Sequence, residues 1–538
     1  MADADADAAK LVSEERIFPP PTEQKTIPLS ILDCTTVRFA LTCAAWIYDA
    51  PTTSSARLAS SPKHLLKSLK STLEAYPQWA GQLLWNTYDP SNASGHTHRH
   101  GRIAVKYGGG QTSGEPGVGF FVARHPGKVE DLIPSVSGRA TNNAGRWAID
   151  AQLPSHTLLS PELVAFQDNV SHLGLPAMSI QLTCFADGGY AVGGKMCHAL
   201  ADAASLVTFM HDWARTNRAM ASSQPLPTLE PVFDPALLDS LAAGDIDAPQ
   251  PDLQIVKNVR ELPIHRYDWF ASGTPNCPPF FRPFTQPPPE LDISNNPEWV
   301  RGVAIPWEEW DLAVPVRHTI IYFSAEEIRG MHDKASHAGT VKLSKLDALL
   351  AHVWACILRA RDLGPDEKAY LDMTFGFRTR LGLPEKFLGS PIRLTGVRAL
   401  TSSAQTNDIS SLARQIRETI GRFDKETCQE ILHDLAHEPS AQNIWATFLG
   451  RHHTLTTSWT NLGLYGVSFS DDGTAPRYVD ATMPPSDGLL QVSEAAPRDG
   501  KVRTDEGDWA KDGASVSLHL RMDVMEKLCA DSSLRAYA

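Results

Sequence analysis

Hydrophobic positions follow two different periods along the chain. Three stretches repeat apolar residues every three or four positions, as a helix with one buried face does, and they cover residues 65–73, 206–213 and 346–357. Shorter runs alternate or are rich in β-branched residues, as strands are; these are MSIQLTCF, GGYAVGG, HTIIYFS and ASVSLHLRM. Helices and strands are therefore interleaved, and we predict the α/β class with mixed sheets.

A proline-rich segment separates two blocks of similar size. Nine prolines lie between Pro275 and Pro306, and proline fixes φ and lacks an N–H donor, so this segment can be neither helix nor central strand. A chain of 538 residues is also too long for one hydrophobic core. We therefore predict a disordered acidic tail (1–20), an N-terminal lobe (21–230), a crossover linker (231–317) and a C-terminal lobe (318–538), with a cleft between the lobes.

Composition narrows the function classes. The 49 basic and 62 acidic residues leave a net charge of −13, which disfavours nucleic acid and anionic membranes as partners. No apolar run approaches the roughly 18 residues of a membrane span, and the first residues lack the features of a signal peptide. Eight cysteines without any C-x-x-C favour free thiols. We expect a cytoplasmic monomer with no permanent cofactor or metal.

The stretch GGKMCHALADAASL contains an H-x-x-x-D motif, His198 and Asp202, where a predicted strand gives way to a predicted helix. With 19 histidines, about one such motif is expected by chance, and a second one, His519 with Asp523, lies in an alternating strand pattern. Small residues around His198 leave open space for a reactive imidazole. His198 is therefore the candidate for chemistry, and a buried structural histidine is the alternative.

Other clusters are less informative. His96, His98 and His100 have the spacing of one strand face and could grip a metal, but they lie in a predicted loop without a neighbouring carboxylate or cysteine to complete a site. A G-x-S-x-G motif is absent, which disfavours a serine hydrolase. We therefore expect no metal site.

Residues 175–214 resemble the active-site segment of BAHD-type, coenzyme A-dependent acyltransferases, with a Gln-x-Thr strand, a Gly-Gly turn, H-x-x-x-D and a helix ending in Trp-Ala. The resemblance extends in order over most of the chain, through residues 27–48, 65–84, 341–363, 375–392 and 457–469. The long insertions are similar to the fungal branch, such as the trichothecene O-acetyltransferases.

The resemblance implies two chloramphenicol-acetyltransferase-like lobes with the active site in a tunnel between them. It implies direct transfer of a short acyl group, such as acetyl, from acyl-CoA as co-substrate to a hydroxylated small-molecule secondary metabolite. His198 would be the general base and Trp459 the donor to the oxyanion, with Thr457 and Ser458 beside it at the substrate. Lys342 and Lys345 could bind the nucleotide phosphates of coenzyme A, or they could be surface residues that only contribute to solubility.

The resemblance also implies that Asp202 braces the active-site loop by pairing with an arginine rather than contacting the imidazole. Period two along an extended FRTR segment would place Arg378 and Arg380 on one face, and the sequence does not choose between these two structural supports. The chain departs from the family at two positions. Ser468 stands where the family's D-F-G-W-G motif begins with Asp, and Ala203 stands where Gly usually follows the Asp of H-x-x-x-D.

Three alternatives stay open. The acceptor could be an amine rather than a hydroxyl. The reaction could be a condensation-like cyclisation with a carrier-bound acyl group, although condensation domains have a second histidine where this chain has Cys197. The chain could also be a catalytically silent relative that binds a small molecule. Neither the acyl group nor the acceptor can be named from the sequence.

Overall fold

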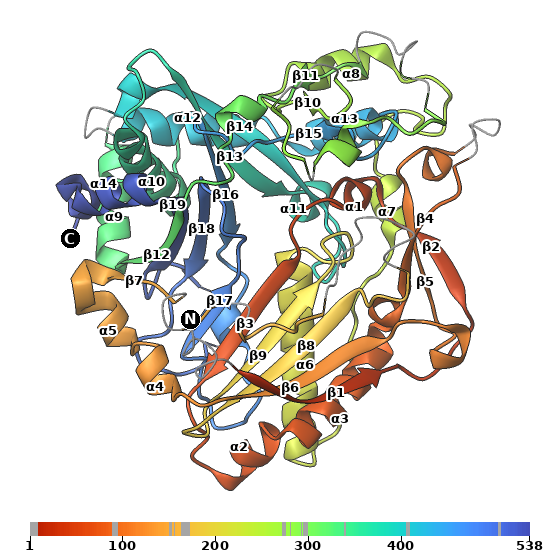
Figure 1. The fold of residues 1–538 in the computed structure, drawn as a ribbon, viewed down its shortest axis with the longest axis vertical. Coiled ribbons are helices and arrows are strands. Elements are labelled where there is room, and N and C mark those ends of the chain that lie inside the picture. The colour runs from red at the N-terminus through yellow and green to blue at the C-terminus, as the bar shows by residue number, and fades with distance from the viewer. Residues whose placement is uncertain are drawn as a thin grey trace.

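The computed structural model describes residues 9–538 except for residues 89–94, 150–152, 155–156, 163–172, 272–275, 280, 292, 294–299, 338–340, 405–408 and 504–506. Two large sheets, two small sheets and the helices that cover them make up the fold (Figure 1). Both large sheets mix parallel and antiparallel pairs. The predicted α/β class with mixed sheets is therefore confirmed.

The first large sheet has six strands. In spatial order they are β1 (Lys10–Ile17), β6 (Val118–His125), β8 (Met178–Phe185), β9 (Tyr190–Met196), β3 (Thr42–Tyr48) and β17 (Tyr478–Ala481). β8 coincides with the run MSIQLTCF. The backbone at Leu158 packs directly on β9, the strand that leads to His198. A Cβ on Gly193 would lie 2.0 Å from the Leu158 carbonyl oxygen, so glycine is required at this position.

The second large sheet has seven strands. In spatial order they are β14 (Ile392–Leu400), β13 (Lys368–Gly376), β16 (His453–Trp459), β18 (Leu489–Glu494), β19 (Ala514–Arg521), β12 (Val316–Phe323) and β7 (Arg146–Trp147). β12 and β19 correspond to the predicted runs HTIIYFS and ASVSLHLRM. The two large sheets exchange edge strands. β7, from the first part of the chain, lies in the second sheet, and β17, from the last part, lies in the first sheet. The sheets therefore do not follow the predicted boundaries at residues 230 and 317.

Two small sheets extend the framework. One contains β2 (Lys25–Pro28), β5 (Ile103–Tyr107) and β4 (Gln82–Trp85). The other joins β11 (Val303–Ala304) and β10 (Tyr267–Asp268) of the linker to β15 (Ile444–Trp445). The linker also forms α7 (Pro235–Asp239) and α8 (Leu253–Arg260). It is thus tied to the second half of the chain by β-pairing.

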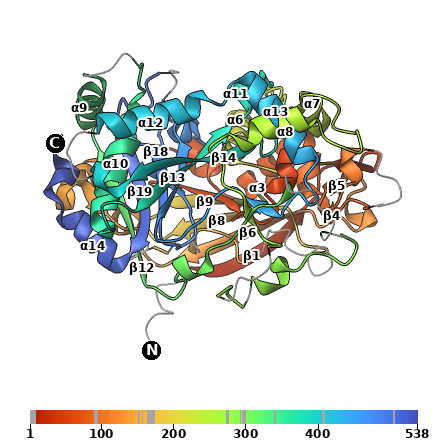
Figure 2. The ribbon, with the colours of Figure 1, turned by 90° about the horizontal axis from the view of Figure 1, so that it is seen from above.

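The predicted helical stretches lie within three helices, α3 (Pro62–Thr72) with the short turn after it, α6 (Ala203–Ala221) and α10 (Lys345–Arg361). α3 and α6 pack together over the first sheet, and α10 packs among α9 (Ala325–Ser336), α12 (Ser410–Gly421) and α14 (Met522–Ala530) beside the second. Figure 2 shows α9, α10, α12 and α14 together at one end of the molecule. The remaining α-helices are α1 (Ile31–Thr35), α2 (Ser54–Ala59), α4 (Val129–Leu132), α5 (Val136–Thr141), α11 (Arg378–Leu381) and α13 (Lys425–Ala436).

The prediction of a disordered tail through residue 20 is wrong for residues 10–17, which form β1. This strand pairs antiparallel with β6, and its side chains are exposed except at Ile17. Backbone pairing rather than side-chain burial therefore holds β1, which is why its polar composition gave no strand signal. Among the described residues, every helix is too short or too polar to cross a bilayer.

Candidate active site

His198 lies on the short connection between β9 and α6. The Cys197 N–H donates to the Ala177 carbonyl at 2.9 Å, and the Leu200 N–H donates back to the Cys197 carbonyl at 3.0 Å. Asp202 then caps α6 by accepting the Ser205 N–H at 3.0 Å. The connection is thus fixed by hydrogen bonds on both sides of the histidine.

The imidazole of His198 is held by two neighbours from distant parts of the chain. Its Nδ1 lies 2.8 Å from Oγ of Ser390, and the ring meets Phe39 edge to face with centroids 5.4 Å apart. Burial lowers the pKa of His198 below its ordinary value, and the nearby Asp202 offsets only part of this shift. This shift favours the neutral imidazole, the state in which it can accept a proton.

Asp202 braces the loop by pairing with Arg378. The Nη1 and Nη2 of Arg378 donate to the two oxygens of Asp202 at 2.5 and 2.9 Å, a bidentate pair, and Nε donates to the Phe387 carbonyl at 2.9 Å. Both charged side chains are largely buried. No hydrogen bond joins Asp202 to His198, both of which the structure describes, so the geometry is that of a brace and selects Arg378.

Arg380 has a different role, and its predicted position on one strand face with Arg378 is wrong. The FRTR segment is not extended: Arg378–Leu381 form the short helix α11, in which residues two apart point to nearly opposite sides. Arg380 donates to the Phe423 carbonyl at 2.8 Å and to the Gly376 carbonyl at 2.7 Å. It therefore stabilises the far side of α11.

Ser390 and Asp33 also belong to this neighbourhood, although no sequence motif marks either of them. Ser390 contacts His198, and the Ser390 N–H donates to Asp33 at 2.6 Å. Asp33 also accepts from the Ser30 hydroxyl at 2.6 Å, and its burial raises its pKa to about 7. Both residues lie in segments that carry the family resemblance, but their contact joins positions too far apart for a pattern to reveal it.

The candidates in the second lobe lie on the end of β16. Trp459 is buried in a core cluster that also contains Cys197 and Ala199, the neighbours of His198. With the Gln491 amide oxygen turned toward the indole, Nε1 of Trp459 donates to it at 3.3 Å. Thr457 shares the strand face of Trp459, while the Ser458 hydroxyl faces away and lies 2.8 Å from that of Thr460.

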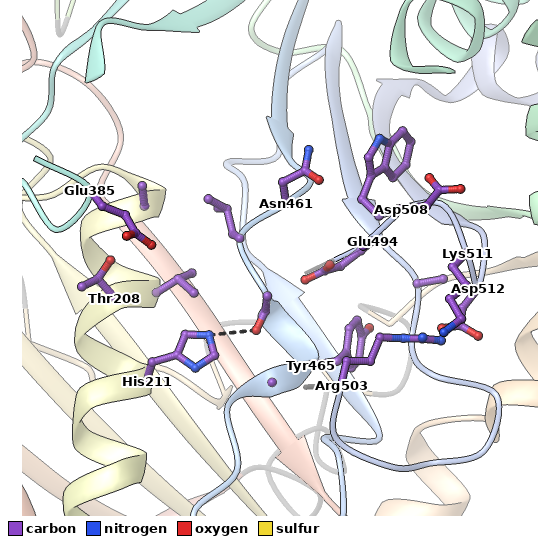
Figure 3. Close-up of a pocket in the computed structure, with 18 of the residues that line it drawn as sticks. Thr208, His211, Glu385, Asn461, Tyr465, Glu494, Arg503, Asp508, Lys511 and Asp512 are labelled. Carbon is purple, nitrogen blue, oxygen red and sulfur yellow. Dashed lines mark hydrogen bonds and ion pairs between the residues drawn. The ribbon is translucent and has the colours of Figure 1, made fainter. Parts of the chain in front are cut away.

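A cavity of about 880 Å³ opens between α6 and the second half of the chain. Figure 3 shows Thr208 and His211 of α6 facing Tyr465, Glu494 and Arg503 across it. His211 lies 3.0 Å from the Gly463 carbonyl. His198 is not among the residues described as lining this cavity.

Charged side chains of both signs surround the same cavity. Arg503 pairs with Asp512, and Lys386 pairs with Asp212 at 3.2 Å. Lys345, one of the two predicted phosphate contacts, pairs with Asp508 on the cavity wall. Lys342, the other, is exposed on the surface. Of the two lysines, Lys345 at the start of α10 is therefore the one that contacts a residue of the cavity wall.

The competing histidines are engaged elsewhere. His519 is buried and stacks on His318 with centroids 4.2 Å apart, while Asp523 pairs with Arg521 at 3.2 Å. His96 lies between two carboxylates, 3.1 Å from Asp239 and 2.8 Å from Asp247. Neither group resembles the His198 loop.

A family model described as "Transferase family" matches residues 148–261 and 275–528. The chain is 28% identical over 506 residues to acyltransferase AFT15-1 of Alternaria alternata, covering 91% of this chain and 90% of that protein. It is 24% identical over 548 residues to acyltransferase abl6 of Leptosphaeria maculans, covering 98% of each.

The fold is similar to that of F. sporotrichioides TRI101, whose crystal structure is a complex with coenzyme A and T-2. The TM-score is 0.61 with 15% sequence identity, and the match covers 95% of this chain and 99% of that one.

Proposed function

This chain belongs to the Transferase family, the BAHD-type acyltransferases, and on that premise we propose that it moves a short acyl group, such as acetyl, from acyl-CoA to a hydroxyl of a small-molecule secondary metabolite, with His198 as general base. The observation that carries the proposal is the placement of His198, whose Nδ1 lies 2.8 Å from Ser390 Oγ on a loop that the Asp202–Arg378 pair holds. The coenzyme A and T-2 bound to TRI101 support the two substrate classes.

The proposed reaction needs only the two substrates and one proton acceptor. If Nδ1–H of His198 donates to Ser390, Nε2 keeps its lone pair and takes the acceptor's proton as that oxygen attacks the thioester carbonyl. The tetrahedral intermediate then collapses, the C–S bond breaks, and the thiolate of coenzyme A recovers the proton from His198. An ester and free coenzyme A result, with no covalent acyl-enzyme.

Trp459 is our candidate donor to the developing oxyanion, because an indole N–H only donates and is rigidly placed. Its 3.3 Å contact with Gln491 is long for a hydrogen bond and can be exchanged for a charged acceptor. Thr457 on the same strand face would line the substrate, and Ser458 would support the strand. The tunnel between the lobes would bring both substrates to His198.

We assign the acyl-CoA nucleotide to the cavity between the lobes, whose basic residues can meet phosphates. We predict that adding millimolar acetyl-CoA raises the melting temperature, because a ligand that binds only the folded chain stabilises it. Differential scanning fluorimetry and calorimetry check this. An absent shift and absent heat, together with binding of an acyl carrier protein, would favour the condensation-like alternative.

Ser390→Ala tests the contact that orients the imidazole. Losing a hydrogen bond worth about 1 kcal/mol is expected to lower kcat several-fold and leave KM for acyl-CoA unchanged. The dependence of activity on pH should have the same form in Ser390→Ala as in the wild type. In both, activity falls as the pH drops through the His198 pKa, which burial sets below its ordinary value, because only the deprotonated ring accepts a proton.

The matched control is Ser517→Ala, which removes a serine hydroxyl lying 2.8 Å from Nε2 of His318 in the second sheet. It should leave kcat unchanged. Equal kcat for Ser390→Ala and the wild type would show that Ser390 does not position the base.

A further inference from the structure

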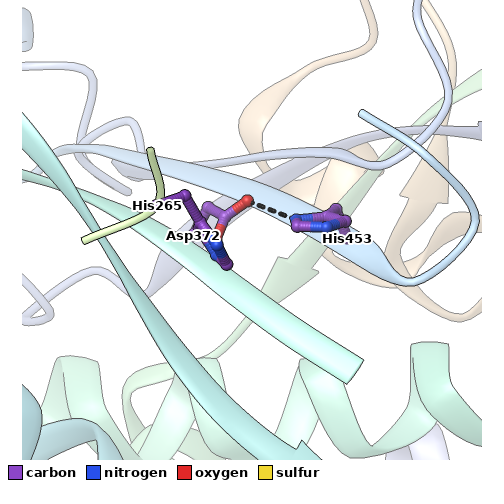
Figure 4. A group of neighbouring side chains, drawn as sticks. All are labelled: His265, Asp372 and His453. Atoms are coloured by element: carbon purple, nitrogen blue, oxygen red, sulfur yellow. Dashed lines mark hydrogen bonds and ion pairs between the residues drawn. The ribbon is translucent and has the colours of Figure 1, made fainter. Parts of the chain in front are cut away.

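A second cluster of chemically active side chains lies in the other half of the molecule. His265 of the linker, Asp372 of β13 and His453 at the start of β16 converge, as Figure 4 shows. Nε2 of His265 lies 3.0 Å from one oxygen of Asp372, and Nδ1 of His453 lies 2.7 Å from the other. The three residues come together only through the fold.

We propose that this cluster binds a divalent transition-metal ion, with Zn²⁺ as the fitting ion. Each residue offers one ligand atom, and these atoms all lie within 4.8 Å of one another. Two imidazole nitrogens with one carboxylate oxygen form a ligand set that Zn²⁺ accepts, leaving a fourth position for water. Mg²⁺ and Ca²⁺ prefer all-oxygen sites and do not fit this donor set.

The surrounding residues orient the ligand atoms. The outer nitrogen of His453, Nε2, lies 3.2 Å from the Tyr267 hydroxyl, so the ring is held with Nδ1 toward Asp372. The Thr447 hydroxyl donates to Asp372 at 2.8 Å. Fixing a histidine through its second nitrogen and a carboxylate through a hydroxyl is the usual support of a metal site.

One member of the cluster, His265, lines a cavity, while Asp372 and His453 are buried. A cavity of about 480 Å³ is lined by His265, Tyr370 and Gly396. A Cβ on Gly396 would lie 2.5 Å from Nε2 of His265 and 3.0 Å from the nearer oxygen of Asp372. Glycine at position 396 is therefore required for His265 and Asp372 to pack this closely against the backbone of β14.

The competing account is a hydrogen-bonded His–Asp–His group without an ion. The N···O distances of 2.7 and 3.0 Å are those of hydrogen bonds. Ligands about 2.0 to 2.2 Å from a tetrahedral ion lie roughly 3.3 Å apart, so each histidine must move away from Asp372 by a few tenths of an ångström, and the two histidine nitrogens, which lie within 4.8 Å of each other, must both reach the same ion. Metal uptake must also release any proton shared with the histidines.

The bound ion would act as a structural clip. It would tie residues that lie 107 and 81 positions from Asp372, joining the linker to the second sheet. His453 begins β16 and Trp459 ends it, so the clip lies about 20 Å from Trp459 along the strand. The effect of the ion should therefore be on stability, not on the acyl-transfer step.

Titration of the full-length protein tests the proposal. After dialysis against EDTA, Zn²⁺ added in a calorimeter should bind with a stoichiometry of one at the tightest site, and it should raise the melting temperature by several degrees. Mg²⁺ at the same concentration should do neither. His265→Gln, which changes the most exposed of the three ligands, should weaken the tight binding by more than about tenfold.

Two further variants make the result decisive. His96→Gln alters another histidine placed between carboxylates and should leave the tight site intact. Gly396→Ala fills the space beside the ligand atoms and should also weaken Zn²⁺ binding, which keeps the test valid if His265→Gln misfolds by circular dichroism. Absent tight binding, or equal binding in wild type, His265→Gln and Gly396→Ala, would overturn the proposal.

Discussion

Replacing His198 by alanine is expected to lower kcat by about 10²- to 10⁴-fold, the usual contribution of a general base. The acceptor's hydroxyl is hardly ionised at neutral pH, so without the imidazole nothing in the proposed mechanism removes its proton as it attacks. Acyl-CoA affinity should stay near that of the wild type, because the lost group acts on the acceptor. Steady-state kinetics and acetyl-CoA titration measure the two quantities separately.

The control for this variant is His519→Ala. His519 belongs to the chain's other H-x-x-x-D motif, but it stacks on His318 in the second sheet, so its loss should affect stability more than kcat. Circular dichroism and melting curves must show that His198→Ala is folded. Substantial activity in folded His198→Ala, or an equal loss in both variants, would reject His198 as the base.

What the sequence predicts correctly is what neighbouring residues determine. Helical period over residues 346–357 predicts α10 because one face of that helix must be buried, and alternation predicts β8. The H-x-x-x-D motif is equally local, since four residues fit one turn between a strand and a helix cap. These features need no knowledge of distant partners.

What the sequence does not predict depends on distant partners. β1 is polar and exists because its backbone pairs with β6. α11 is only four residues long, too short to show a helical period, so the sequence pattern predicts an extended FRTR segment where the structure has a helical turn. Ser390 reaches His198 across 192 positions, and His265 reaches Asp372 across 107. Only the assembled sheets bring such pairs together.

Asp202→Ala is expected to destabilise the fold and also reduce activity. Asp202 and Arg378 form a largely buried bidentate pair, and removing one partner leaves the other charge uncompensated, at a cost of about 3 to 5 kcal/mol in the free energy of unfolding. Asp202 also caps α6, which is worth about 1 kcal/mol more. The melting temperature should fall by several degrees, and kcat should fall because the His198 loop loses its brace.

A double-mutant cycle with Arg378→Ala isolates the pair. Its coupling energy should be large, so the double variant should lose much less stability than the sum of the two single losses. Arg380→Ala serves as the matched arginine, because Arg380 binds the Phe423 and Gly376 carbonyls and its effect should add to that of Asp202→Ala. If Asp202→Ala were as stable as the wild type and only turnover fell, the brace would be wrong, and a direct action of Asp202 on His198 would replace it.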